Sequence, residues 1–193
     1  METIIGSVVL LVVGASAFMN YETLTNNVTY VKSNVDGNKY LVQNLEDKQE
    51  AADLLARVRQ KLVKFVNQLA IKYPNRPDVQ RLKRNFNPNV IVEKPDNGDY
   101  TSYTINKGQK IVICLRPKNS KQELIEENVV MFVALHEISH CMCKSVGHKP
   151  EFWEDFKFVL KEAIEDGTYK YVNFNSNPHQ YCGIKITDSP YHP

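Results

Sequence analysis

Apolar and polar side chains alternate between residues 28 and 43, on both sides of the dipeptide Asp36-Gly37. This period of two, interrupted by a turn dipeptide, predicts a β-hairpin. From Asn44 onwards the apolar positions recur with the 3.6-residue period of a helix, and the repeat ends near Tyr73, just before a proline. The pattern therefore predicts a long helix whose buried stripe is formed by Leu54, Leu55, Val58, Leu62, Phe65, Val66 and Leu69.

Further strands are predicted in the middle of the chain. Residues 90–93 form a short apolar segment that is typical of a strand. The alternating segments 100–105 and 110–115 flank a turn that contains Gly108, which predicts a second β-hairpin.

Two helices are predicted in the C-terminal half. Ser120 and Glu123 have the spacing of a capping box, which would start a helix that continues through the apolar run 129–135. A second helix is predicted from Pro150 to Glu165, because aromatic and aliphatic side chains recur there near helical spacing. The tail after this helix has no helical period, and we expect it to be irregular.

The segment that follows the apolar run has the residues of a metal site. His136 and His140 are four residues apart, so on a helix both imidazoles lie on one face and can bind one metal ion. Glu137 lies beside them, where a carboxylate that does not bind the metal can act as a general base. With 5 His in the chain, chance produces such a His-Glu-x-x-His segment in only about 1% of cases. The spacing therefore predicts a catalytic Zn²⁺ site.

A third protein ligand is required, because a catalytic zinc ion keeps three protein ligands and one open position. His148 is the favoured candidate, since Gly147 before it allows the chain to turn back toward the helix. The alternative is Glu162 on the next helix, because a glutamate from a second helix can also complete such a site. Zinc accepts imidazole readily, which favours His148 without excluding Glu162.

These residues give the chain a resemblance to zincin metallopeptidases of the WLM and SprT-like group, which are small, gluzincin-like proteases. The resemblance covers roughly residues 100–165 and rests on the HEISH segment, the later Gly-His pair and the aromatic start of the next helix. It implies that His136, His140 and His148 bind zinc and that Glu137 is the catalytic base. The spacer of seven residues before the third histidine is longer than usual for WLM and shorter than is common for SprT-like proteins. WLM-like proteins are also encoded by large DNA viruses.

The resemblance also implies how a substrate would bind. In zincins an edge strand commonly pairs with the extended substrate, and the strand over residues 110–116 would take this role here. An oxyanion at the metal needs a hydrogen-bond donor. The candidate donors in the tail are Tyr169, Tyr171, His179 and Tyr181.

Residues 3–19 contain no charged side chain, and as a helix they would cover about 25 Å of the roughly 30 Å hydrocarbon core of a membrane. We interpret them as a retained anchor, because a signal peptide should begin with basic residues and only Glu2 is charged here. The alternative is a secreted protein cleaved near Ala17. Lys32 and Lys39 then predict a single-pass membrane protein with a cytoplasmic catalytic domain, with a viral membrane as one setting.

The formal net charge of +2 hides a basic segment between residues 57 and 84, which carries nine basic side chains and one acidic one. A solvated helix face is one explanation of this segment. The alternatives are partners rich in phosphate, either anionic lipid or nucleic acid.

The four cysteines are expected to be free thiols. Cys114, Cys141, Cys143 and Cys182 do not have the spacing of a disulfide scaffold, so we predict a reducing compartment. A redox or metal-storage protein that uses Cys141, Cys143 and His148 is disfavoured, because the two cysteines diverge on a helix.

These patterns predict an α+β fold. The expected structure is a small zincin-like domain with a short mixed or antiparallel sheet, an HExxH helix and flanking helices. One N-terminal transmembrane helix is expected to precede this domain. The expected domains are an anchor or signal peptide over 1–20, a hairpin and linker over 21–44, and the metallopeptidase over 45–193. The predicted function is hydrolysis of a protein or peptide substrate by zinc-activated water with the help of Glu137. The alternative is a catalytically idle, membrane-anchored zinc-binding scaffold for protein or phosphate-rich partners.

Overall fold

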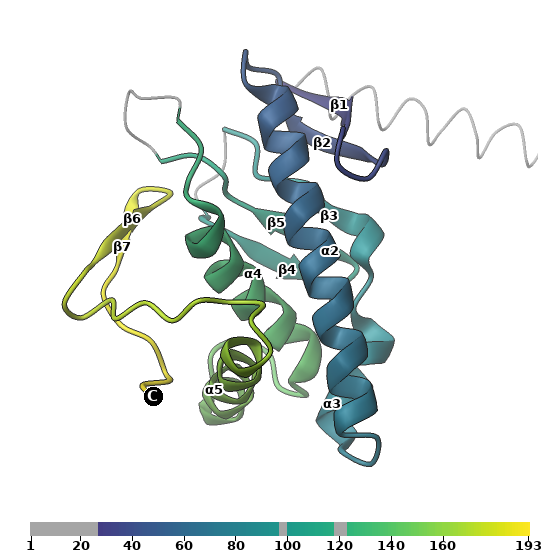
Figure 1. Ribbon diagram of the computed structural model, residues 1–193, viewed down its shortest axis with the longest axis vertical. Helices are drawn as coiled ribbons and strands as arrows, with labels where there is room; N and C mark the ends of the chain where they lie inside the picture. The colour runs from purple at the N-terminus through teal and green to yellow at the C-terminus, as the bar shows by residue number, and fades with distance from the viewer. Residues whose placement is uncertain (1–26, 97–99, 118–122) are drawn as a thin grey trace, which may run out of the picture.

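The computed structural model describes residues 27–96, 100–117 and 123–193, in which helices and strands are mixed along the chain (Figure 1). The elements follow in the order β1, β2, α2, α3, a short 3-10 turn, β3, β4, β5, α4, α5, β6 and β7. The predicted α+β class is therefore confirmed.

The N-terminal hairpin and the long helix have the predicted positions. β1 (Val28–Lys32) and β2 (Lys39–Gln43) pair antiparallel around a turn in which Gly37 has a positive φ of 72°. β2 packs against α2 (Lys48–Lys72), whose apolar stripe lies in the main core. The domain boundary that we placed at residue 44 stays a prediction, although the hairpin and α2 share one core.

A buried ion pair joins the hairpin to the central sheet. Glu93 is fully buried at the end of β3 and accepts hydrogen bonds from Arg116 Nε at 2.8 Å and from the backbone N–H of Gln43 at 2.7 Å. Arg116 also contacts Asp47 at the start of α2. Burial raises the pKa of the Glu93 carboxyl, and the Arg116 guanidinium opposes that rise. These bonds replace the water that the buried groups lose, so they fix the hairpin relative to the sheet.

The central sheet has three strands, β3 (Ile91–Glu93), β4 (Tyr103–Ile105) and β5 (Lys110–Ile113), in the order β3-β5-β4. β5 pairs parallel with β3 and antiparallel with β4, which confirms the second predicted hairpin. The expectation that the strand over residues 110–116 lies at the edge is wrong, because β5 has a partner on each side. Within the described residues, β4 is an edge strand, and it lies against α4.

The turn between β4 and β5 packs closely against two helices through Gly108. A Cβ atom at this position would clash with the carbonyl oxygen of Asn85 at the end of α3 (Pro77–Asn85) and would lie 3.1 Å from Sγ of Cys141. The φ of Gly108 is 117°, a conformation that residues with a side chain rarely adopt. Glycine therefore allows the turn to hold β4 beside the helices.

α4 (Glu127–Met142) lies in the middle of the molecule and is buried along most of its length (Figure 1). The predicted start of this helix at a capping box is wrong. Glu123 precedes the helix in the structure, and Ser120 lies outside the described residues. The physical reason is a competing hydrogen bond, in which the backbone N–H of Ile125 donates to the carbonyl of Leu115 at 2.8 Å. This bond ties the segment before the helix to the end of the strand.

α5 (Pro150–Glu165) has the predicted position and packs against α4. It ends before Gly167, which has a positive φ of 78°. The sequence did not predict α3, nor the hairpin of β6 (His179–Tyr181) and β7 (Ile184–Ile186) in the tail. Figure 1 shows this yellow hairpin on the side of α4 away from α2.

The prediction of four free thiols is wrong for two of them. Cys114, which follows β5, forms a disulfide with Cys182 in the turn between β6 and β7. Their Cα atoms are 6.1 Å apart, within the range that a disulfide spans, although 68 residues separate them in sequence. Cys141 and Cys143 are free and buried. The argument for a reducing compartment therefore no longer holds.

The predicted membrane localisation is also corrected. No helix within residues 27–96, 100–117 and 123–193 is long and apolar enough to cross a bilayer. This finding contradicts the single-pass membrane protein that we predicted. Residues 3–19, on which that prediction rested, lie outside the described residues.

Candidate metal centre

Three histidines meet at the C-terminal end of α4. His136 and His140 lie one turn apart on the helix, and His148 comes from the loop between α4 and α5. The Nε2 atoms of His136 and His148 are 3.0 Å apart, and one ring nitrogen from each of the three histidines lies within 4.8 Å of the other two. The structure thus brings together the three side chains that we expect to bind zinc, and their role as ligands stays a prediction.

The loop that presents His148 is held by the first turn of α5. The carboxylate of Glu151 accepts hydrogen bonds from the backbone N–H groups of Lys144 at 3.1 Å and Ser145 at 3.0 Å. Trp153 Nε1 donates to the carbonyl of His148 at 3.1 Å. These bonds fix the backbone on both sides of Gly147, so α5 positions His148.

Aromatic rings of α5 support the imidazoles. The ring of Phe152 is stacked on His140, with centroids 4.3 Å apart and planes at 24°. His136 makes edge contacts with Phe152 at 4.8 Å and with Phe156 at 5.1 Å. Both phenylalanines are buried, so one side of the histidine cluster faces an apolar wall.

Burial keeps the imidazoles neutral. It lowers the pKa of His136 to about 3 and that of His140 to about 4, and the neighbouring histidines add to both effects. Burial also lowers the pKa of His148. A neutral imidazole is the form that binds a metal ion, so the cluster is ready to bind one at neutral pH without first losing protons.

Glu137 is buried beside the histidines, with 3% of its surface exposed. The hydroxyl of Thr104, on the edge strand β4, donates to Oε2 of Glu137 at 2.8 Å. Burial raises the pKa of the Glu137 carboxyl to about 7, and the hydrogen bond from Thr104 opposes that rise. A carboxyl group with a pKa near 7 can both accept and release a proton at neutral pH.

The histidines and Glu137 open into a cleft of about 450 Å³. The side of the cleft opposite α4 is formed by β4 and the turn after it, where Lys107 donates to the carbonyl of Ser145 in the His148 loop. Tyr100 and Val146 are strongly exposed at the cleft. The residues that line this side carry no motif, so they were not predicted from the sequence. They are Tyr100, Ser102, Tyr103, Thr104, Asn106 and Lys107.

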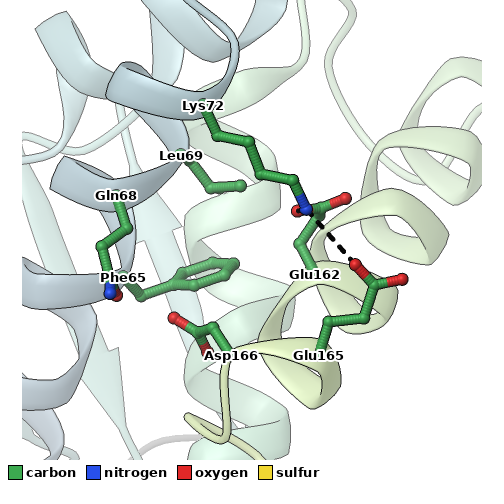
Figure 2. Close-up of a pocket in the computed structure, with 7 residues that line it drawn as sticks. All are labelled: Phe65, Gln68, Leu69, Lys72, Glu162, Glu165 and Asp166. Atoms are coloured by element: carbon green, nitrogen blue, oxygen red, sulfur yellow. Dashed lines mark hydrogen bonds and ion pairs between the residues drawn. The ribbon is translucent and has the colours of Figure 1, made fainter.

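Glu162, the alternative third ligand, lies in a different pocket between α2 and α5 (Figure 2). Its carboxylate accepts hydrogen bonds from Lys72 Nζ at 2.7 Å and from the Tyr73 hydroxyl at 2.6 Å. Figure 2 also shows the ammonium group of Lys72 between Glu162 and Glu165. The structure therefore separates Glu162 from the histidine cluster.

The two free cysteines do not join the histidines. Cys141 lies at the turn of Gly108, on another face of α4. The Sγ atom of Cys143 lies within 4.8 Å of carboxylate oxygens of Glu151 and Asp155. The structure therefore does not bring Cys141, Cys143 and His148 together as one metal site.

None of the four tail residues that we proposed as oxyanion donors is among the residues that line the cleft. The Tyr181 hydroxyl is buried and hydrogen-bonded to Ser102 at 2.6 Å. Tyr169 packs on Phe132 in the core, while His179 packs on Phe174 and Tyr171 contacts His192. Within the described residues these side chains have structural partners, and the oxyanion donor stays unassigned.

The basic segment between residues 57 and 84 is largely paired within the protein. Arg57 and Lys61 both form ion pairs with Glu127 at 2.7 Å. The guanidinium of Arg76 lies 3.6 Å from the ring centroid of Phe158, and Arg81 donates to the carbonyl of Met142. These contacts give the segment structural roles, and its binding to lipid or nucleic acid stays a prediction.

Comparison with known proteins shows the family of the chain. The sequence model of the WLM domain matches residues 34–191. An uncharacterized protein of Acanthamoeba polyphaga mimivirus is 31% identical over 189 residues, which cover 96% of this chain and 95% of that protein. An uncharacterized protein of Invertebrate iridescent virus 3 is 40% identical over 85 residues, 44% of this chain and 48% of that protein.

A solved structure that resembles this chain is the crystal structure of Wss1 from Saccharomyces cerevisiae. The match has a TM-score of 0.47 and 20% identity, and it covers 65% of this chain and 88% of Wss1. The WLM match and the mimivirus relative each cover most of the chain. The viral relatives belong to large DNA viruses, as the resemblance implied. The chain belongs to the WLM domain family.

Proposed function

We propose that this protein is a zinc-dependent peptidase in which His136, His140 and His148 bind the metal and Glu137 is the general base. The WLM family is a zinc metalloprotease family, which supports the reaction class. The observation that carries the proposal is the convergence of three neutral imidazoles next to a buried carboxylate, at the bottom of an open cleft.

The chemistry of the donor set fits zinc. Zinc in catalytic sites takes three protein ligands, and imidazole nitrogen is one of its preferred donors. The three ring nitrogens lie within 4.8 Å of one another, and burial keeps the rings neutral. The cleft leaves one side of the cluster open, where water and a substrate can enter. When bound, zinc would polarise the scissile carbonyl and lower the pKa of water.

Glu137 would move the proton in this reaction. Its carboxylate would accept a proton from the attacking water and then donate it to the leaving amine. Burial keeps the carboxylate away from bulk water, and the 2.8 Å hydrogen bond from Thr104 holds Oε2 in place. The remaining lone pairs of the carboxylate are then available for the water in the cleft.

The substrate main chain would lie along β4. This strand lines the cleft and is an edge strand, so its outer N–H and C=O groups can pair with an extended peptide. β4 has only three residues, which at about 3.3 Å per residue span roughly 10 Å. Pairing would therefore fix only the residues next to the scissile bond, and it would be largely independent of their side chains.

The test compares the full-length wild-type protein with Glu137→Gln, both loaded with zinc and incubated with unfolded casein. We expect fragments from the wild-type protein and a rate lower by about 10²–10⁴ in the variant, the typical contribution of a general base. Glu154→Gln changes an exposed glutamate on α5 and serves as the matched control, with activity like that of the wild type.

The same experiment separates the proposed peptidase from the catalytically idle scaffold. Zinc content, measured by mass spectrometry, should be one ion per chain in all three proteins. Equal rates in the wild type and Glu137→Gln would contradict the proposal. A wild-type protein that holds zinc but cleaves nothing would favour the scaffold.

A further inference from the structure

A second hollow, of about 600 Å³, lies next to the histidine cluster and is not part of the cleft described above. It is bounded by α4 and α5 on one side and by the tail after β6 on the other. Its walls are mainly apolar. The apolar side chains that form them are Phe132, Trp153, Phe156, Ile184, Ile186 and Pro190.

The hollow has a buried bottom and exposed apolar walls. Phe132 and Phe156 are almost fully buried, whereas 44% of Trp153 and 50% of Ile184 are exposed. Large exposed apolar side chains that face one concave space are typical of a binding site for an apolar group. Thr187, Asp188 and Ser189 add polar groups to the lining of the hollow.

His136 connects the hollow to the cleft, because it lines both of them. Glu137, the proposed general base, is its neighbour on α4. A peptide whose scissile bond lies at these two residues would place its flanking side chains next to His136, which forms part of the wall of the hollow. His136 therefore lies between the hollow and the proposed reaction site.

The tail wall of the hollow is fixed to the rest of the protein. The disulfide between Cys114 and Cys182 joins the turn before β7 to the end of β5. The buried hydroxyl of Tyr181 forms a 2.6 Å hydrogen bond with Ser102. Ile184 and Ile186 follow Cys182 by two and four residues. These two contacts therefore hold the tail wall of the hollow in place.

We propose that this hollow is the specificity pocket of the peptidase and binds a large apolar side chain, such as leucine or phenylalanine, of the substrate residue next to the scissile bond. The inference rests on the proposed function, because that function places the scissile bond at His136. A large apolar side chain would cover the exposed faces of Trp153 and Ile184 and remove them from water. Alanine at the same position is too short to reach these walls.

The expected preference for leucine over alanine follows from the additional apolar groups that leucine would place in the hollow. A single methylene group in an apolar pocket changes discrimination by about 10–200-fold. We therefore expect a peptide with leucine at the position next to the scissile bond to be bound and cleaved at least ten-fold better than the same peptide with alanine. The cleaved bonds, identified by mass spectrometry in a peptide library, show on which side of the bond the apolar residue lies.

Binding can be measured without catalysis, because Trp153 lines the hollow and is the only tryptophan of the chain. The zinc-loaded, full-length Glu137→Gln protein is titrated with a leucine-containing peptide that lacks tryptophan, and with its alanine counterpart, while the Trp153 fluorescence is recorded. We expect a saturable change with the leucine peptide at a concentration at least ten-fold lower than with the alanine peptide.

Ile184→Lys places a charge on the exposed wall, and we expect it to weaken binding of the leucine peptide at least ten-fold while leaving the alanine peptide unchanged. Ile71→Lys is the matched control, because Ile71 is 80% exposed on α2 and lines neither the hollow nor the cleft. Circular dichroism checks that both variants are folded. Ile184→Ser repeats the test with a smaller side chain.

The outcomes separate the inference from the proposed function. Equal affinity for the leucine and alanine peptides, or equal weakening by Ile184→Lys and Ile71→Lys, would overturn the pocket and leave the peptidase untouched. Failure of the wild-type protein to cleave any peptide would overturn the peptidase. Preference for leucine in both binding and cleavage, lost in Ile184→Lys alone, supports the pocket.

Discussion

Two buried glutamates of this protein differ in their partners. Glu162 on α5 is held by the Lys72 ammonium at 2.7 Å and the Tyr73 hydroxyl at 2.6 Å. Glu137 on α4 is buried to a similar degree, but its carboxylate accepts a hydrogen bond from the neutral hydroxyl of Thr104 at 2.8 Å. Burial without a neighbouring cation raises the pKa of the Glu137 carboxyl to about 7.

The difference shows which carboxylate is suited to chemistry. A carboxylate that pairs with a cation on a neighbouring helix serves as a structural contact between the two helices. A carboxylate that burial holds near its point of titration can exchange a proton at neutral pH. The same residue type thus has a structural role on the α2 side of α5 and a proposed catalytic role at the cleft.

The largest expected effect is on zinc binding, and it tests whether the histidine cluster and the Glu162 pocket are separate sites. His148→Ala should weaken zinc binding by more than 100-fold, beyond the 10–100-fold that loss of an outer partner of a metal ligand costs. Glu162→Gln should leave zinc binding unchanged, because its carboxylate contacts Lys72 and Tyr73. Both are measured by competition with a chromophoric chelator. Unchanged affinity in His148→Ala would remove it from the ligand set.

The next prediction concerns the stability of the metal-free protein, which Glu137→Gln and Glu162→Gln should change in opposite directions. The folded-state pKa of Glu137 is about 7, above the ordinary value of 4.5. Between these pH values the folded protein binds more protons than the unfolded chain, so its stability falls as the pH rises from about 4.5 to about 7. Glu137→Gln removes this loss. We therefore expect the variant to be more stable than the wild type at pH 8, by about 1–3 kcal/mol, and similar to it at pH 5.

Glu162→Gln should change stability in the opposite direction. It removes the charge that pairs with Lys72, so we expect its Tm at pH 8 to fall by about 2–4 °C. Both variants are measured by thermal unfolding after zinc is removed with a chelator. A decrease in Tm for both variants would mean that burial of Glu137 does not destabilise the fold, and the comparison would fail.

The smallest effect concerns the hydrogen bond between the Thr104 hydroxyl and the Glu137 carboxylate. Thr104→Val keeps the shape of the side chain but removes the donor, which should raise the pKa of Glu137 further and reduce kcat by about ten-fold. The acidic side of the pH profile of kcat should then shift to higher pH. Thr29→Val in β1 is the control, because Thr29 is not among the residues that line the cleft. A profile identical to that of the wild type would show that Thr104 does not position the base.

Local patterns were sufficient for the elements whose side chains repeat regularly. The period of apolar positions located the hairpin of β1 and β2, α2, the hairpin of β4 and β5, and α5. The HEISH segment located His136 and His140, because two residues four positions apart on a helix lie on the same face. The Gly-His pair likewise indicated His148, since a glycine lets the chain turn at that point.

Features that depend on contacts between distant segments were not predictable. α3 has only two buried apolar side chains, Val79 and Leu82, too few to show a period. The central position of β5 depends on the parallel partner β3, which no local pattern reveals. Thr104 is 33 residues before Glu137, and no motif links them. The capping box failed because a hydrogen bond from Ile125 to the strand competes with the helix.

The disulfide has a consequence for how self-cleavage would be seen. It closes a loop that contains all of α4 and α5, and with them every proposed ligand, since Cys114 and Cys182 lie 68 residues apart around these helices. A single cut within that loop leaves two pieces that remain covalently joined. A protein cut once in that loop would then run as one band on a non-reducing gel and as two bands after reduction, so autolysis within the loop is visible only when the bridge is broken.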